Sequence, residues 1–307
     1  MKTQQRARGD EAFRKAEKLV NKPNGWAGFM WKPDFSGAAI NYEEAGNNFR
    51  AAGAMDLANV ALQRAGQNYS KINQHYQAAQ NFQKAAILMA THENLWITAA
   101  EQWQLAGEPC LACDTLFRGA EKSMNTNLYW LTLEAAAEIA SGGVEEQARK
   151  SFLYFISNNL LDQAVKAAPL LLSALNSLDN DHPNRLRAYT AIVILYLAQK
   201  NIQQADQTFL DALSNSSYGP SEQARIAENI IAAIKQNDQE ALTRAISSSD
   251  LAALDFQVAQ LVKSSVSCVD SFSSSMQDDV DDDAATTQLS FDKDDEEYDD
   301  DALPDIT

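Results

Sequence analysis

Several residue types and patterns are scarce in this 307-residue chain, and each absence excludes a class of protein. No apolar run approaches the roughly 18 residues that a transmembrane helix needs, and the N-terminus has no apolar signal core. Only 7 prolines and 12 glycines occur, which suits helices joined by short turns. Motifs for phosphate loops, serine hydrolases and zinc proteases are missing. We therefore expect a cytoplasmic protein that is not an enzyme, with no cofactor and no small-molecule substrate.

The three cysteines also offer little chemistry. Cys110 and Cys113 form a Cys-x-x-Cys pair and Cys268 stands alone. A zinc site would need a second ligand pair, and a redox motif would need a preceding strand. We interpret the pair as small packing residues and expect no metal site. The alternative is a thiol oxidoreductase, which requires an exposed sulfur with a depressed pKa.

Negative charge is concentrated at the C-terminus. Residues 277–307 contain 14 acidic residues and one lysine, in a chain whose formal net charge is −17. Nucleic-acid binding normally needs a basic surface, so we expect no nucleic-acid partner. Together with the serine-rich stretch before it, this composition predicts a disordered tail over residues 267–307.

A repeated pattern of small and large residues is the most informative feature that is present. An alanine or cysteine is followed four residues later by a bulky apolar residue and seven later by another apolar one, which places all three on one helical face. The first four sets start 20, 20 and 21 residues apart, so a helical hairpin takes about 40 residues. The sets are Ala38/Tyr42/Ala45, Ala58/Leu62/Ala65, Ala78/Phe82/Ala85, Ala99/Trp103/Ala106, Cys113/Phe117/Ala120, Ala148/Phe152/Phe155 and Ala205/Phe209/Ala212.

This period predicts an all-α fold, a tetratricopeptide-like right-handed solenoid of antiparallel helix hairpins over residues 1–183. A C-terminal helical bundle is predicted over residues 184–266. We expect its last helix to span Asp250–Val262. Asn237 and Glu240 resemble a capping box at the start of the helix before it.

One loop near the N-terminus has two tryptophans, a phenylalanine and a methionine within six residues, at Trp26, Phe29, Met30 and Trp31. One interpretation is that they cover the open end of the solenoid. The other is that they insert into a membrane surface, because aromatic side chains favour the headgroup region. A single loop would bind weakly and would depend on avidity.

Two further features have both a plain and a functional interpretation. The acidic tail is either a solubilising segment or, because apolar residues occur near its end, a peptide that docks on a basic groove of a partner. The basic residues of the helices, among them Arg118, Lys122, Arg149 and Lys150, are either solvated or positioned to meet an acidic rod-like partner.

Two stretches of the chain resemble the soluble NSF attachment protein family, in particular its gamma type. They are residues 31–50, WKPDFSGAAINYEEAGNNFR, and residues 187–206, RAYTAIVILYLAQKNIQQAD. The resemblance extends loosely from Ala12 to Val266 and returns in the acidic C-terminus with its penultimate isoleucine. It implies a twisted sheet of antiparallel helices followed by a globular helical bundle.

The resemblance also implies a function. Family members bind assembled SNARE four-helix bundles on membranes and recruit the hexameric ATPase called N-ethylmaleimide-sensitive factor, which pulls the bundle apart. It places the membrane-binding loop on residues 26–31, and on the SNARE-facing side only Arg149 or Lys150 matches a basic residue of the family. We expect SNARE contacts on Arg118, Lys122, Arg149 and Lys150. The ATPase-binding element falls on Asp299, Asp300, Asp301, Leu303, Asp305 and Ile306. A general helical scaffold for another trafficking or chaperone assembly is the alternative.

Overall fold

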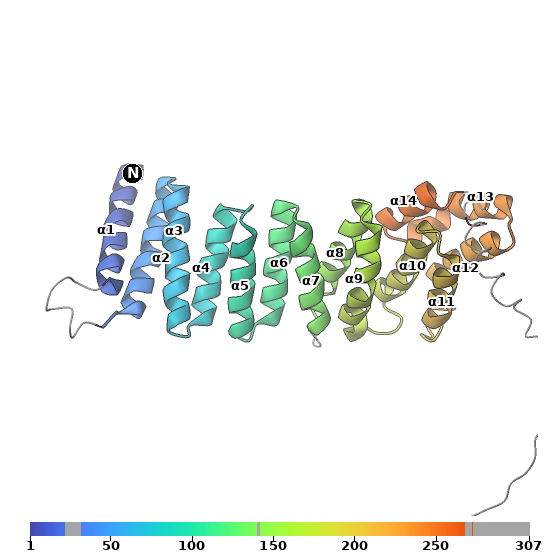
Figure 1. Cartoon of the computed structure of the whole chain (residues 1–307), viewed down its shortest axis with the longest axis horizontal. Coiled ribbons are helices and arrows are strands. Elements are labelled where there is room, and N and C mark those ends of the chain that lie inside the picture. The colour runs from blue at the N-terminus through green and yellow to red at the C-terminus, as the bar shows by residue number, and fades with distance from the viewer. Residues whose placement is uncertain (22–31, 140–141, 268–271, 273–307) are drawn as a thin grey trace, which may run out of the picture.

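The computed structural model describes residues 1–21, 32–139, 142–267 and 272, and the elements within these ranges are all helical. Figure 1 shows helices α1 to α9 side by side in a row, with α10 to α14 gathered at one end. The helices of the row are α1 (Lys2–Val20), α2 (Phe35–Ala52), α3 (Met55–Lys71), α4 (His75–Leu88), α5 (Glu93–Leu105), α6 (Pro109–Ser123), α7 (Thr126–Glu138), α8 (Glu145–Ser157) and α9 (Leu161–Ala174).

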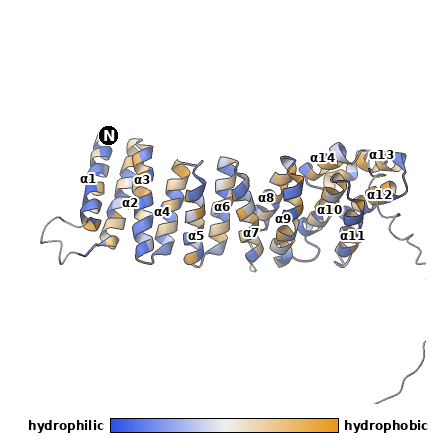
Figure 2. Cartoon of the chain, viewed as in Figure 1, coloured by the Kyte–Doolittle hydropathy of each residue, from blue (hydrophilic) through white to orange (hydrophobic). Residues whose placement is uncertain are grey.

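The small and large residues of the sequence repeat lie in the core of the fold. Every member of the seven sets is buried except Ala106, which lies at the C-terminal end of α5. Each helix contacts the next one along the chain, and polar and apolar residues alternate around each helix in Figure 2. The predicted all-α hairpin repeat is confirmed.

Glycines allow the closest approach between neighbouring helices. A Cβ atom on Gly46 would lie 2.7 Å from Leu62, and one on Gly66 would lie 2.8 Å from Phe82. The two glycines are 20 residues apart, and so are the two large residues that they face, which is the spacing of the sequence sets. Each large side chain therefore fills the space that a missing side chain leaves on the preceding helix, which fixes the helices in register.

The turns between helices are short because their residues adopt the left-handed conformation. Gly53 after α2 and Gly107 after α5 have φ values of +80° and +78°, which glycine adopts without steric cost. Asn73 and Asn159 take the same conformation after α3 and α8. These turns reverse the chain within a few residues, so consecutive helices lie side by side.

Polar side chains connect helices that are two apart in the chain. Glu43 of α2 pairs with Lys84 of α4 at 2.8 Å and accepts a hydrogen bond from the Tyr69 hydroxyl of α3. Glu17 of α1 pairs with Arg64 of α3. Burial, with the adjacent Glu43 carboxylate, raises the pKa of Tyr69 to about 12. These contacts align α1 with α3 and α2 with α4.

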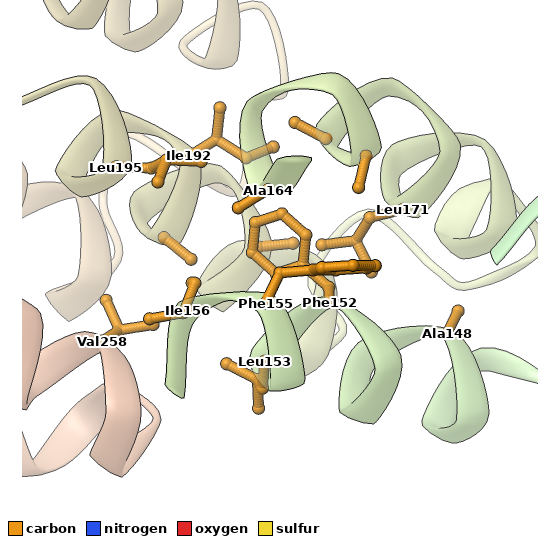
Figure 3. Close-up of a cluster of buried hydrophobic side chains, with 14 of the residues drawn as sticks. Ala148, Phe152, Leu153, Phe155, Ile156, Ala164, Leu171, Ile192, Leu195 and Val258 are labelled. Carbon is orange, nitrogen blue, oxygen red and sulfur yellow. The ribbon is translucent and has the colours of Figure 1, made fainter. Parts of the chain in front are cut away.

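The remaining helices continue the core of the row. They are α10 (Pro183–Ala198), α11 (Ile202–Ala212), α12 (Glu222–Lys235), α13 (Gln239–Ser247) and α14 (Phe256–Ser265). Figure 3 shows Phe152 and Phe155 of α8 among Leu171 of α9, Ile192 of α10 and Val258 of α14. One hydrophobic cluster thus includes residues from both sides of position 183. The predicted boundary between two domains at that position remains a prediction.

Two local predictions in this region were wrong. Residues Asp250–Val262 do not form one helix, because a 3-10 turn over Ser249–Ala253 ends before Leu254 and α14 begins at Phe256. The capping residue of α13 is Asp238, whose carboxylate accepts the Ala241 amide at 2.8 Å. Asn237 instead occupies the left-handed turn before it, with a φ of 52°.

The glycine contacts give a test of this packing. Gly66→Ala raises the intrinsic helix propensity by about 1 kcal/mol, yet its Cβ would overlap the buried Phe82 ring. Overpacking of this kind costs about 1–3 kcal/mol, so we expect a net loss of stability. Urea unfolding followed by circular dichroism measures it. Gln67→Ala, at the exposed neighbouring position, is the control and should not be destabilising. Equal stability of the two variants would contradict the proposed close packing.

Candidate partner-binding surfaces

Two of the three predicted binding segments lie outside the described residues. These are the aromatic loop, with Trp26, Phe29, Met30 and Trp31, and the C-terminal element, with Asp299, Asp300, Asp301, Leu303, Asp305 and Ile306. Their roles stay predictions. The ends of α1 and α2 that flank the loop are described, and the amide of Asp34 donates to the Leu19 carbonyl at 3.0 Å. The described residues on either side of the loop therefore lie next to each other.

The four predicted SNARE-binding cations occur on two neighbouring helices, α6 and α8, which contact each other. Arg118 and Lys122 are one turn apart on α6 and both are exposed. Arg118 pairs with Asp114 on the same helix at 2.9 Å. Such an exposed pair contributes little to stability and can exchange its partner at low cost. Both side chains are thus accessible to a binding partner.

Lys150 on α8 extends the basic group toward α6. Its ammonium lies 5.9 Å from the centroid of the Phe117 ring and 3.7 Å from the Glu146 carboxylate, and half of its side chain is exposed. Nearby aromatic residues fix the position of α8, since Tyr154 stacks on Tyr129 with ring centroids 3.9 Å apart. Lys150 therefore lies beside α6, on a helix that packs against α7.

Arg149 has a different environment from the other three cations. Only 18% of its side chain is exposed, and it pairs with Glu146 at 2.9 Å and with Asp255 at 2.5 Å. The hydrogen bond from Arg149 holds the pKa of Glu146 below its ordinary value, and the hydrogen bond to Glu146 raises the pKa of Arg149. Its charge is already paired within the protein, so Arg149 is the least available of the four cations for binding a partner.

Asp255 belongs to a short segment that three arginines hold in place. Arg225 of α12 pairs with Asp250 at 3.1 Å, and Arg187 of α10 donates to the Ala253 carbonyl at 3.0 Å. The Arg149 contact joins the row of helices to the C-terminal helices, and the Arg187 and Arg225 contacts fix the segment against α10 and α12. The sequence does not reveal this joint, because residues 149 and 255 are too far apart for any local pattern to connect them.

The Cys-x-x-Cys pair is packed into the fold. Cys113 is fully buried, and burial, with smaller effects of Asp114 and Cys110, raises the pKa of its thiol to about 12. Its sulfur donates to the Thr132 carbonyl. A raised pKa is the opposite of what a reactive thiol needs, so the oxidoreductase alternative is wrong for Cys113. Across the described ranges, no group of His, Cys, Asp and Glu side chains is arranged to bind a metal ion.

Sequence comparisons agree with this architecture. Residues 7–130 match the family model described as "Soluble NSF attachment protein, SNAP". A gamma-soluble NSF attachment protein of Arabidopsis thaliana is 27% identical over 248 residues, covering 76% of this chain and 84% of the relative. The family model and this relative both indicate similarity to the soluble NSF attachment protein family. A gamma-soluble NSF attachment protein of Dictyostelium discoideum is 22% identical over 276 residues, covering 86% of this chain and 84% of the relative.

The matches to gamma-type members continue beyond the segment that the family model covers. That segment ends within α7, whereas the two relatives align with most of this chain. None of the helices in the described ranges is both long and apolar enough to cross a bilayer.

The contrast between Arg149 and Lys150 yields a prediction. Arg149→Gln leaves Asp255 without its cation, so we expect a loss of about 2 kcal/mol in the free energy of unfolding, between the values for exposed and fully buried pairs. Lys150→Gln, on the adjacent exposed residue, should change it by less than about 0.5 kcal/mol. Urea titrations of both variants measure these values. Equal stabilities would show that Arg149 does not anchor the joint.

Proposed function

We propose that this protein is a non-enzymatic adaptor that binds assembled SNARE four-helix bundles and recruits the N-ethylmaleimide-sensitive factor hexamer to take them apart. In this mechanism the ATPase supplies the energy of ATP hydrolysis, and the adaptor binds both the SNARE bundle and the ATPase. The protein would act in the cytoplasm on intracellular membranes during vesicle traffic.

The observation that carries the proposal is the similarity to gamma-type attachment proteins over most of the chain, combined with a continuous row of helices. Stacked helices with short turns present long surfaces, which suits a rod-like partner better than a small molecule. The side-chain pairs between α1 and α3 and between α2 and α4 restrain neighbouring repeats. A stiff surface loses little conformational entropy when it binds.

On the described helices, Arg118, Lys122 and Lys150 are the residues best suited to meet an acidic face of a SNARE bundle. They are exposed and lie on the contacting helices α6 and α8. Exposed charge pairs contribute modestly, so one adaptor would bind weakly and several copies around one bundle would bind by avidity. In this scheme Arg149 maintains the position of α8 and touches no partner.

The acidic C-terminus is proposed to dock on basic surfaces of the ATPase, with Leu303 and Ile306 as apolar anchors. Acidic residues would speed and orient the encounter, while a buried aliphatic side chain would slow dissociation. This division of roles fits a tail in which apolar residues follow a dense acidic run.

Deletion of residues 303–307 tests the proposed anchor. We expect full-length protein to recruit the ATPase to immobilised SNARE complex in the presence of a non-hydrolysable ATP analogue. Loss of the anchor should reduce recruitment at least about tenfold, as for an interface residue worth more than about 1.4 kcal/mol. Deletion of residues 285–289, which shortens the tail equally and removes no acid, is the control. SNARE binding is measured on the same beads, and undiminished recruitment by the 303–307 deletion would refute the anchor.

The aromatic loop gives a separate prediction. Replacing Trp26, Phe29, Met30 and Trp31 by serine should abolish flotation with phosphatidylcholine–phosphatidylserine vesicles while leaving SNARE binding in solution intact. Serine replacement of the exposed residues Ile87, Leu210 and Phe256 is the matched control and should retain flotation. Equal flotation of the two variants would favour the plain interpretation, in which the loop covers the end of the solenoid.

A further inference from the structure

A groove of about 320 Å³ lies between α5 and α7, and none of its lining residues is among the predicted contact residues. Its floor is apolar, with Ile97 of α5, Leu116 of α6 and Leu131 of α7. Its rim carries the exposed carboxylates of Glu101, Glu134 and Glu138. Leu116 belongs to α6, which lies behind α5 and α7, so the groove opens on the side away from α6.

The charge around this groove is of one sign. Helices α5 and α7 contain glutamates and have no lysine, arginine or histidine in their sequences. In the part of the chain that the structure describes, none of the three rim glutamates forms a salt bridge. Glu134 does accept a hydrogen bond from the Trp130 indole at 2.7 Å, which holds its carboxylate near the helix surface. By contrast, α6 and α8 each carry as many basic as acidic residues.

We infer that this groove binds a helical segment of a partner protein in which a row of apolar side chains is flanked by lysine or arginine. The rim and floor residues recur at helical spacing, at 97, 101 and 104 on α5 and at 131, 135 and 138 on α7, so the groove follows the helix axes for about two turns. An amphipathic helix can place leucines on the floor and cations beside the glutamates.

Other occupants fit the groove less well. A metal ion would need several carboxylates converging on one point, whereas these belong to two helices and border an apolar floor. An acidic segment would be repelled by the rim. The cations proposed to meet SNARE bundles lie on α6 and α8, so this inference concerns a second surface and does not rest on the proposed function.

The experiment measures binding of fluorescent helical peptides to the full-length protein by anisotropy. The first peptide carries leucines at helical spacing flanked by lysines. In a second peptide glutamate replaces each lysine, and in a third serine replaces each leucine. We expect saturable binding of the first peptide only. The combined variant E101Q/E134Q/E138Q should weaken that binding at least about tenfold, since each exposed charge pair contributes about twofold to fivefold.

A charge-matched variant provides the control. E44Q/E121Q/E228Q removes three exposed acids from α2, α6 and α12 and should bind the first peptide as the unmodified protein does. Equal weakening by both triple variants would show that only the overall charge matters and would overturn the inference. Equal binding of the leucine and serine peptides, or undiminished binding by the groove variant, would overturn it as well.

Discussion

Close approach between neighbouring helices is the constraint on which the rest of this structure depends. Alanines and glycines on one helix leave room for the large side chains of the next, as Gly66 does for Phe82. Because the same arrangement recurs along the chain, the helices form a continuous row with long exposed sides. The contacts proposed on the described helices, namely the α6 and α8 cations and the α5–α7 groove, use those sides and require the helices to keep their register.

The joint with the C-terminal helices extends this constraint beyond the repeat. Three arginines, Arg149, Arg187 and Arg225, come from different helices and converge on the segment 250–255. Alongside them, Phe155 and Val258 belong to one apolar core. In the adaptor mechanism that we propose, this joint would hold the SNARE-facing helices and the ATPase-facing end in a fixed relation. Arg149 is better explained by this positioning role than by direct contact with a partner.

Periodicity predicted much of the fold, because burial in a solenoid depends on neighbours in sequence. The sets from Ala38 to Phe155 placed buried residues correctly, with Ala106 as the exception at a helix end. Contacts between residues that are far apart in the sequence leave no such periodic pattern. Nothing near Arg149 indicates Asp255, and nothing in α5 alone indicates that Glu101 shares a groove with Glu134. The break before α14 was missed because Asp250–Val262 has the composition of a helix, while the arginine contacts of the joint hold its first residues in another conformation.

The most direct test of the account is ATP-driven release of a fluorescently labelled SNARE complex from beads. The reaction would contain the ATPase and Mg-ATP, with or without this protein. The adaptor mechanism predicts that release depends on this protein, requires hydrolysable nucleotide, and increases steeply with its concentration because several copies act together. Release at the same rate without it, or no release with it at saturating concentration, would contradict the central claim that this row of helices couples the ATPase to SNARE bundles.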